Sequence, residues 1–415
     1  MSGENMITLN NQTTNGPREL KTRLAGKLAI AALLVAAQPA FAEAQKTVPK
    51  QLATVGSVKI DNLSVAKAPP SDIKRFYVVD PGHFNVTSQT FVMGANDNKL
   101  QLHGIIDGGK LPHVMASSTG KYVGIANTTY DRIAHGKRDD YVRLHDAQTL
   151  EPAVDVDIPE IRFLTGLIER FAAFSTDDKH MLVQQFSPSS GVGLVDLQQK
   201  KYVKTMEIPD CYHIFPTAKQ NFFMHCRDGS MLQVSYDDQG NTKQKNTKVF
   251  HAENEYLHNN PYYSNSAGRL VWPTYEGKIF QAKLSESGAE FLKPIEIFSD
   301  KEKKEKWAPG GWQPVAMHKE RNEIYLLSDK RAKWTHKTAS RFVVVADATT
   351  GKRLRRIDLK HNIDSIAVTQ DKNPTLITAS IEDKSVYTFD AVSGKQLASM
   401  DEIGKAPQII ITMDK

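Results

Sequence analysis

The sequence is short of cysteine and of apolar runs long enough to cross a membrane. It has two cysteines in 415 residues, and its apolar run from Leu28 to Ala37 is about half as long as a bilayer span requires. No long helical pattern alternates with strand-like segments, which disfavours an α/β fold. Aromatic residues make up 8% of the chain, while 25 glycines and 19 prolines are spread along it. This composition is typical of many short strands joined by turns.

The N-terminal segment has the pattern of an export signal. Basic residues within 21–27 precede the apolar run, and Ala40-Phe41-Ala42 follows it, as a signal peptidase requires. We therefore expect residues 1–42 to be a signal peptide cleaved after Ala42, and the mature protein to be periplasmic; a retained membrane anchor is the alternative. The segment holds four basic and two acidic residues. Its loss brings the formal charge of +6 closer to neutral, and nothing indicates a nucleic-acid partner.

Export also bears on the two cysteines, Cys211 and Cys226. Thiols in an oxidising compartment tend to pair, so we expect a disulfide between them. The alternative is a pair of metal ligands. A spacing of fifteen residues without flanking cysteines or paired histidines is a poor zinc pattern.

One unit recurs along most of the chain. It is a strand-like run that ends in a polar turn of the form Asp-x-x-(Thr/Ser)-Gly-Lys, most clearly at Asp347 and Asp390. Weaker copies bring the number to seven, spaced by 41 to 63 residues, at positions 94, 146, 196, 237, 284, 347 and 390. This period is typical of β-propeller blades. The sequence therefore predicts an all-β, seven-bladed β-propeller over residues 72–415, preceded by an extended arm over residues 43–71.

The two ends of the predicted propeller complement each other. The opening pattern Gly-x-x-Pro followed by a strand occurs at Gly109–Pro112 and again at Gly404–Pro407, where the chain ends after one strand. The first unit, from Arg75 to Asp80, lacks that opening strand. We expect the C-terminal strand to pair with the first blade and close the ring, which removes exposed sheet edges.

A search for catalytic and metal-binding motifs finds none. There is no Gly-x-Ser-x-Gly elbow or P-loop, and Gly191–Val195 is only a fragment of a dinucleotide fingerprint. His251 and His258 are seven residues apart, and a surface or capping role is expected rather than a metal site. The four tryptophans are expected to pack in the core or between blades. An enzyme subunit, a ligand-binding module and an interaction platform all stay open.

Several long strings resemble one known family, the heavy chains of methylamine dehydrogenase. The similarity runs from about Phe76 to the C-terminus, and its most specific strings are EIPDCYHIFPTAKQNFFMHCRDGS, AGRLVWPTYEGKI, PGGWQPVAMH and HKTASRFVVVADATTGKRL. The resemblance implies a non-catalytic scaffold subunit in a heterotetramer of two heavy and two light chains. It also implies that tryptophan tryptophylquinone lies in the light chain, that primary amines are oxidised to aldehyde and ammonia, and that electrons pass to an amicyanin-like blue-copper protein.

The same resemblance implies roles for a few residues of this chain. Phe84, in DPGHFNV, is similar to an aromatic residue at the mouth of the family's substrate channel, where it would select small amines; packing on a blade is the alternative. Cys211 and Cys226 match the family's heavy-chain disulfide, and the flanking Asp210 and Arg227 are hypothesised to face the light chain. No catalytic residue and no metal ligand is expected in this chain.

Three other functions stay open from the sequence. The first is the heavy chain of an aromatic amine dehydrogenase, the second a non-enzymatic binding propeller, and the third a propeller that carries its own dissociable quinone. The substrate profile would separate the first from methylamine dehydrogenase, and the native mass and spectrum would separate the other two.

Overall fold

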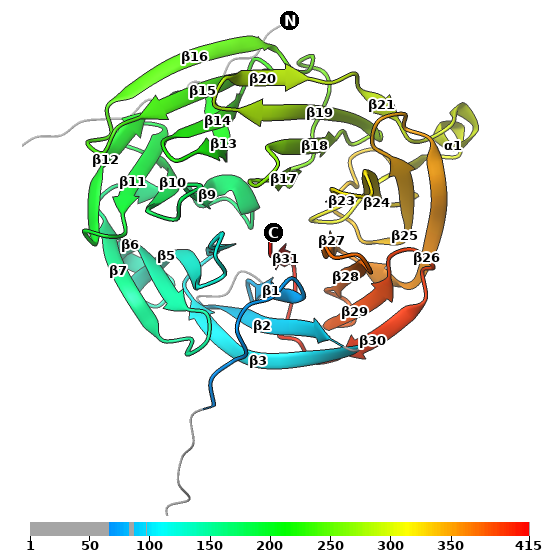
Figure 1. The fold of residues 1–415 in the computed structure, drawn as a ribbon, viewed down its shortest axis with the longest axis horizontal. Coiled ribbons are helices and arrows are strands. Elements are labelled where there is room, and N and C mark those ends of the chain that lie inside the picture. Colours follow the sequence, from blue (N-terminus) through cyan, green and yellow to red (C-terminus); the bar gives the residue numbers. More distant parts are fainter. Residues whose placement is uncertain (1–65, 83–86, 97, 415) are drawn as a thin grey trace, which may run out of the picture. The chain divides into compact units, whose positions relative to one another are not determined.

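Seven antiparallel sheets form the blades of a ring around a central axis (Figure 1). The computed structural model describes residues 66–82, 87–96 and 98–414. The predicted all-β, seven-bladed propeller is confirmed. The predicted signal peptide and residues 43–65 of the predicted arm lie outside the described residues. At the described end of the arm, the buried Ala68 donates its N–H to the carbonyl of Gln148, at 2.8 Å.

Each blade has four main strands, which we give from the axis outward. Blade 1 consists of β31 (Ile409–Thr412), β1 (Arg75–Asp80), β2 (Ser88–Asn96) and β3 (Lys99–Gly108). Blade 2 consists of β4 (His113–Ala116), β5 (Tyr122–Arg132), β6 (His135–Asp146) and β7 (Pro152–Ile158). Blade 3 consists of β8 (Ile161–Arg162) and β9 (Ala172–Phe174), followed by β10 (His180–Ser187), β11 (Gly191–Asp196) and β12 (Lys201–Glu207). The 3₁₀ turn η1 (Glu169–Phe171) precedes β9.

The remaining blades follow the same order. Blade 4 consists of β13 (Cys211–Ala218), β14 (Asn221–Cys226), β15 (Ser230–Tyr236) and β16 (Thr242–Val249). Blade 5 consists of β17 (Tyr262–Ser264), β18 (Arg269–Pro273), β19 (Lys278–Ser285) and β20 (Gly288–Phe291), with β21 (Ile295–Glu296) also on β19. Blade 6 consists of β22 (Trp307–Pro309) and β23 (Val315–His318), followed by β24 (Glu323–Lys330), β25 (Ser340–Asp347) and β26 (Arg353–Ile363). Blade 7 consists of β27 (Ser365–Val368), β28 (Thr375–Ser380), β29 (Ser385–Asp390) and β30 (Gln396–Met400). The single helical turn α1 (Asp300–Lys304) is exposed and carries a capping box.

The repeated aspartate is part of the turn that follows the third strand of a blade. The carboxylate of Asp347 accepts hydrogen bonds from the N–H groups of Thr349 and Thr350, and Asp390 accepts from Val392 and Ser393 in the same way. Such Asx turns fix a tight reversal of the chain. The repeat seen in the sequence is therefore the chemistry of this one turn.

Apolar side chains between neighbouring blades form the core. Seven clusters of buried residues occur in the described chain, and each joins one blade to the next around the ring. Strands near the axis are buried on both faces, as β1 shows with all six of its residues buried. Each sheet is therefore covered by its two neighbours, which is why the blades need a closed ring.

The C-terminal strand closes that ring as predicted. β31 pairs antiparallel with β1, from Phe76 opposite Thr412 to Val79 opposite Ile409. Gln313 of blade 6 donates to the carbonyl of Ile410 and accepts from its N–H, both at 2.9 Å. β31 is thus bound on one side by the backbone of blade 1 and on the other by a buried amide of blade 6.

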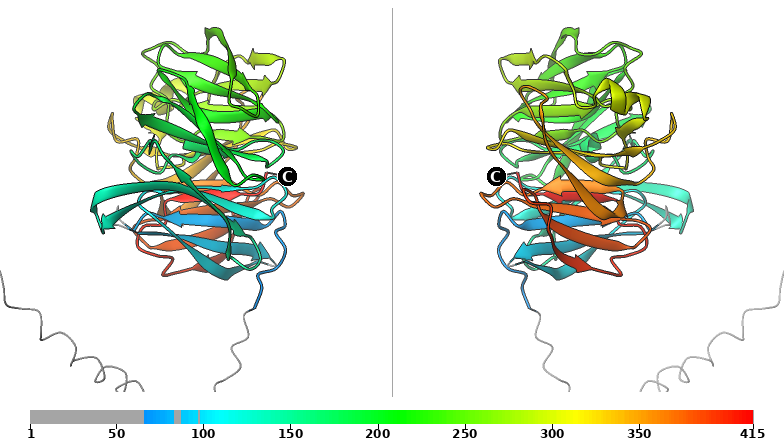
Figure 2. Two further views of the ribbon diagram at one scale, coloured as in Figure 1. Left: turned by 90° about the vertical axis from the view of Figure 1, so that its left-hand side faces the viewer. Right: turned by 90° about the vertical axis from the view of Figure 1, so that its right-hand side faces the viewer.

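The alternation of strands gives the ring two distinct faces. One face carries the connections between second and third strands and those from one blade to the next, and it includes Cys211 and Cys226; we call it the disulfide face. The other carries the turns between first and second and between third and fourth strands, and the C-terminus lies there (Figure 2). We call it the C-terminal face.

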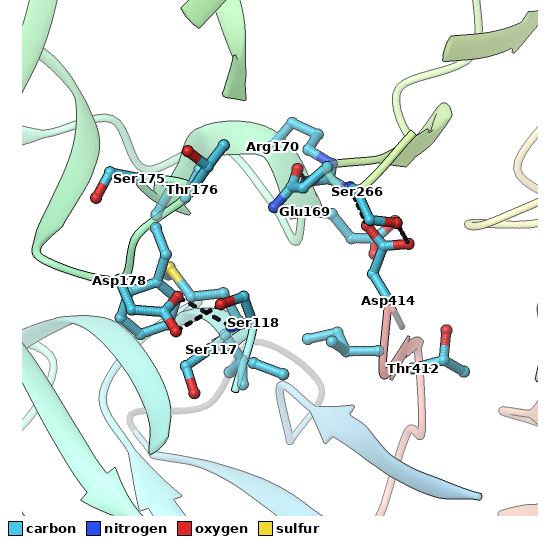
Figure 3. Close-up of a pocket in the computed structure, with 18 residues that line it drawn as sticks. Ser117, Ser118, Glu169, Arg170, Ser175, Thr176, Asp178, Ser266, Thr412 and Asp414 are labelled. Carbon is cyan, nitrogen blue, oxygen red and sulfur yellow. Dashed lines mark hydrogen bonds between the residues drawn. The ribbon is translucent and has the colours of Figure 1, made fainter. Parts of the chain in front are cut away.

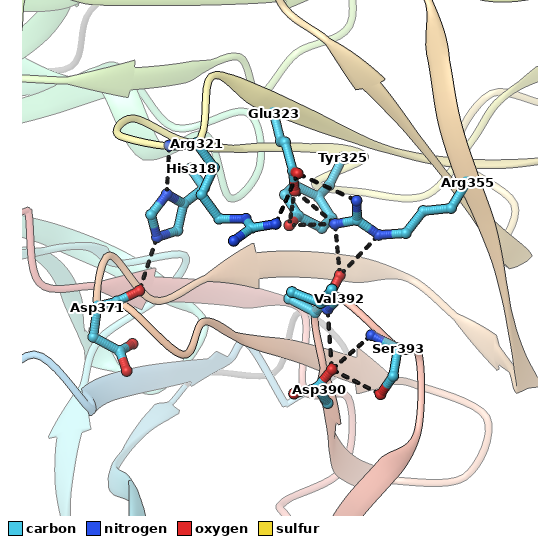
Figure 4. Close-up of polar contacts among 10 residues, drawn as sticks. His318, Arg321, Glu323, Tyr325, Arg355, Asp371, Asp390, Val392 and Ser393 are labelled. Carbon is cyan, nitrogen blue, oxygen red and sulfur yellow. Dashed lines mark hydrogen bonds and ion pairs between the residues drawn. The ribbon is translucent and has the colours of Figure 1, made fainter.

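A buried polar network joins blades 6 and 7 (Figure 4). Arg355 of β26 binds both carboxylate oxygens of Glu323 on β24, at 2.6 and 3.2 Å, and donates to the carbonyl of Ala391 in blade 7, at 2.8 Å. Burial alone would raise the pKa of Glu323, but hydrogen bonds from Arg355, Arg321 and Tyr325 outweigh it and lower the pKa to about 2. The Glu323 side chain is 7% exposed, so solvent screens the pair only weakly.

We predict that Glu323 makes the stability of the protein depend on pH. Because its folded pKa lies below the unfolded value of about 4.5, its contribution is complete above pH 4.5 and is lost as the pH falls toward 2. Glu323→Gln should lower the free energy of unfolding by about 3 kcal/mol at neutral pH, and the difference from the wild type should vanish near pH 2. Urea unfolding measured across this range tests it.

Glu290→Gln is the control, because Glu290 is in an exposed ion pair with Lys283 and should show almost no such difference. A difference between Glu323→Gln and the wild type that is constant across the range would contradict the assignment.

Candidate functional site

The disulfide joins the two innermost strands of blade 4. Cys211 and Cys226 lie opposite each other in the register of β13 and β14 and are bonded to each other, in agreement with the predicted pairing. Both are buried in the cluster between blades 3 and 4. Asp210 precedes Cys211 and Arg227 follows Cys226, and both side chains are exposed at the disulfide face. The N–H of Arg227 donates to the carbonyl of Asp210, at 2.9 Å. The structure thus brings these four predicted residues together.

Phe84 lies outside the described residues. Its neighbours in the described chain are the end of β1 at Asp80 and the start of β2 at Ser88.

Neutral histidines lie beneath the disulfide. The rings of His213 and His225 contact the buried Trp272, with centroids 5.0 and 4.9 Å away, and Nε2 of His225 is 2.6 Å from Nε2 of His251. Burial lowers the pKa of His213 to about 4 and that of His225 to about 3. His251 and His258 are buried, so the expected surface role for them is wrong. These imidazoles are packing groups at neutral pH.

An aromatic cluster lies beside the disulfide on blades 3 and 4. We define the blade 3–4 cluster as Phe163, Phe186 and Tyr212, in which the Phe163 ring is 5.4 Å from that of Phe186 and 5.9 Å from that of Tyr212. Phe186 is 59% exposed, and the neighbouring Ile161 is 41% exposed. Large apolar side chains gathered at a surface mark an interaction site more often than scattered ones do.

A second aromatic cluster lies on blades 5 and 6. We define the blade 5–6 cluster as Tyr256, Tyr275, Trp334 and His336. Trp334 packs edge-on against Tyr256, with centroids 5.1 Å apart, while Tyr275 and His336 stack at 3.6 Å. Trp334 is 57% exposed and Tyr256 is 53% exposed. Of the packing expected for the tryptophans, in the core or between blades, Trp334 shows the second: its ring contacts Tyr256 and Tyr275 of the neighbouring blade, although more than half of it is exposed.

Both clusters belong to the disulfide face. Phe186 ends β10 before the turn to β11, and Trp334 lies in the connection from β24 to β25, both between second and third strands. In Figure 2 the β5–β6 hairpin and the β24–β25 connection project from the side of the ring opposite the C-terminus. The hairpin tip, Ile133, is 71% exposed. The described part of this face therefore combines projecting loops with exposed apolar rings.

A cavity near the axis, with several charged side chains in its lining, opens at the C-terminal face instead (Figure 3). It has a volume of about 220 Å³ and is lined by residues of several blades, including Glu169, Arg170, Asp178 and Asp414. Burial raises the pKa of Glu169 to about 7, against the opposing effect of Arg170. Among its described lining residues none is a histidine, cysteine or lysine. The cavity thus lacks the usual pairing of a nucleophile with a histidine base.

The carboxylates of this cavity are used to hold the ring together. Asp178 of blade 3 accepts from the N–H and the hydroxyl of Ser118 in blade 2, at 2.9 and 2.8 Å. Asp414 accepts from Ser264, at 2.8 Å, and forms an ion pair with Lys319, at 2.9 Å. These contacts tie the C-terminus to blades 5 and 6. The cavity is therefore best explained as the polar end of the central channel.

The described residues offer no site for a metal or a membrane span. No group of three metal-ligating side chains occurs among residues 66–82, 87–96 and 98–414. Within the same ranges, no helix has the length and apolar character that crossing a bilayer requires. The aromatic rings in contact with the described tryptophans belong to phenylalanine, tyrosine and histidine.

Sequence reasoning missed the two aromatic clusters. Phe186 directly precedes Ser187-Pro188, and Tyr256 lies in the polar string HAENEYLH. An aromatic residue within a polar connection is the sequence signal that indicates such a cluster. The sequence alone does not show that connections of different blades meet on one face.

Comparison with known proteins shows similarity over almost the whole chain. Residues 72–414 match the family model described as methylamine dehydrogenase heavy chain (MADH). The methylamine dehydrogenase heavy chain of Methylophilus methylotrophus is 63% identical over 395 residues, which cover 95% of this chain and 96% of the relative. That of Methylobacillus flagellatus is 59% identical, with coverage of 94% and 98%.

A solved structure of low sequence identity shares the fold of this chain. The dihydro-heme d1 dehydrogenase NirN, in complex with DHE, has a TM-score of 0.54 and 14% sequence identity, covering 84% of this chain and 76% of that chain. At this identity the likeness concerns the fold alone.

We predict that the disulfide stabilises the protein by reducing the conformational entropy of the unfolded chain. Replacing both Cys211 and Cys226 by alanine should lower the free energy of unfolding by about 3 kcal/mol, as loop closure over fifteen residues implies. Denaturant unfolding of the double variant, compared with the oxidised wild type, measures this. An unchanged midpoint in the double variant would show that the bond does not constrain the chain.

Proposed function

This chain belongs to the methylamine dehydrogenase heavy chain family, and we propose that it is the non-catalytic scaffold subunit of a periplasmic methylamine dehydrogenase. The complex oxidises primary aliphatic amines to aldehyde and ammonia. The observation that carries the proposal is the 46–63% identity to four methylamine dehydrogenase heavy chains over 85–95% of the chain. The same observation favours methylamine dehydrogenase over the heavy chain of an aromatic amine dehydrogenase.

In the proposed complex, the oxidation of the amine takes place in a light chain. The name heavy chain implies such a partner, and we propose a complex of two heavy and two light chains. Tryptophan tryptophylquinone in the light chain would supply the carbonyl group that accepts two electrons from the amine. The placement of the described tryptophans supports a cofactor outside this chain, because their ring contacts are with other residue types.

The residues of the disulfide face have the proposed task of binding that light chain. Asp210 and Arg227 are exposed there with opposite charges, and charged groups at the rim of an interface favour correct orientation. The adjacent disulfide joins β13 to β14, and the backbones of the two residues are held together by a hydrogen bond. The electrons then leave the complex to an amicyanin-like blue-copper protein.

We predict that the native protein is part of a larger complex. Purified from its own cells, the chain should elute with a small partner at a mass well above 46.3 kDa, and quinone absorbance should lie in the partner. Native mass spectrometry and visible spectra of the separated subunits test this. A lone monomer would support a non-enzymatic propeller, and absorbance in this chain would support a propeller with its own quinone. The N-terminus of the purified chain shows whether residues 1–42 are removed.

A second prediction concerns Phe84 at the mouth of the proposed substrate channel. Removing its ring in Phe84→Ala should improve kcat/KM for longer amines relative to methylamine, by roughly tenfold if one apolar pocket contact decides selection. The ratio of the two kcat/KM values is an internal control, because a folding defect lowers both equally. A ratio equal to that of the wild type would remove Phe84 from the channel.

A further inference from the structure

The exposed Trp334 lies in a loop whose backbone is constrained by its neighbours. Its backbone φ of 70° lies in the left-handed region, which a bulky residue occupies only when its surroundings enforce it. The guanidinium of Arg331 supplies that enforcement, donating to the carbonyls of Thr335 and Thr338, at 2.7 and 3.1 Å. The ring also packs edge-on against Tyr256. An exposed indole on a preorganised loop loses less conformational entropy on binding than one on a loop that must first become ordered.

Residues 331–339, which we call the tryptophan loop, are bonded to the β22–β23 connection and pack through Trp334 and His336 on two tyrosines that are themselves linked by a backbone hydrogen bond. The carbonyl of His336 accepts from the N–H of Gly311, at 2.9 Å, and Tyr275 donates its N–H to the carbonyl of Tyr256, also at 2.9 Å. Three connections therefore present the blade 5–6 cluster as one surface. Preorganisation of this kind is typical of residues that carry most of the energy of an interface.

The positions of the two aromatic clusters indicate how large a binding partner must be to contact both. One lies on blades 3 and 4 and the other on blades 5 and 6, and the β5–β6 hairpin of blade 2 projects from the same face (Figure 2). A short peptide filling one groove would cover one cluster. An occupant that covers both must present a broad folded surface, as in interfaces of standard size.

The charge of the tryptophan loop indicates what surrounds the apolar contacts. Residues 331–339 contain Arg331, Lys333 and Lys337 and no acidic residue. The ammonium groups of Lys333 and Lys337 lie over the rings of Trp334 and Trp312, 5.2 and 4.9 Å from their centroids. Acidic groups opposite them complement this charge.

We propose that the light chain docks on the disulfide face with Phe186 and Trp334 as its two principal anchors, through an apolar patch bordered by acidic groups opposite Lys333 and Lys337. This assignment rests on the proposed function, from which the light chain is taken as the partner. It adds the surface, the anchoring residues and the chemistry that the partner presents. The C-terminal face is left uncovered by this contact.

The test compares anchor variants with variants of equally exposed residues elsewhere. Heavy chains carrying Trp334→Ala or Phe186→Ala are co-expressed with the light chain of the same organism, and the dissociation constant is measured by dilution and native mass. Each variant should weaken the complex by roughly tenfold or more, and Trp334→Phe should recover part of the loss. Val392→Ala, in the β29–β30 turn of the C-terminal face, and Leu102→Ala, on the outermost strand of blade 1, are the controls; these residues are 43% and 44% exposed, and both variants should bind as the wild type does.

Unfolding midpoints of the purified variants show whether the heavy chain itself is intact. If the wild type retains the light chain and both alanine variants bind it with unchanged affinity, the anchors are wrong while the proposed function stands. If the wild type retains no light chain, the proposed function fails. If the wild-type chain forms a dimer that Trp334→Ala dissociates, a second copy covers this face, and the docking assignment is overturned.

Discussion

The pairing of the last strand with the first blade is the constraint on which the rest of the structure depends. β31 is the innermost strand of blade 1, although it comes from the end of the chain. The carboxylate of Asp80, at the end of β1, accepts from the N–H groups of Lys405 and Ala406, at 2.6 and 3.1 Å. Gly404 precedes them with a φ of 70°, and a Cβ there would lie 2.0 Å from Asp80 Oδ2. The closing strand is therefore guided into place by a turn that only glycine fits.

Closure also determines how the two faces differ. Because every blade is packed between two others, the apolar surface is used within the ring, and large exposed apolar groups stand out as exceptions. On the C-terminal face, carboxylates such as Asp414 and Asp178 cross-link blades through hydroxyl and amide donors. On the disulfide face, aromatic rings such as Trp334 and Phe186 lie open to solvent. The carboxylate cross-links stabilise the ring, and the exposed aromatic rings are suited to binding a partner protein.

The sequence predicted the fold well because its strongest signals are local. The aspartate turns at Asp347 and Asp390 and the missing strand before Arg75 each depend on a few consecutive residues, and they gave the number of blades and the mode of closure. The disulfide followed from two cysteines in a chain whose N-terminal segment predicts export. The exposure of Trp334 could not be predicted in this way, because it depends on how Arg331 shapes a long connection and on which loops of other blades lie nearby. The burial of His251 and His258 likewise depends on blade-to-blade packing that their spacing does not encode.

We propose that a folded partner protein binds one face of the closed ring, and that exposed apolar residues of this chain anchor it there. Hydrogen–deuterium exchange of the heavy chain, alone and in the native complex, tests it most directly. The account predicts slower exchange in the complex for backbone amides of the β5–β6 tip, the β10–β11 turn and residues 331–339, with turns of the C-terminal face unchanged. Slower exchange confined to the C-terminal face, or to the outermost strands, would contradict it.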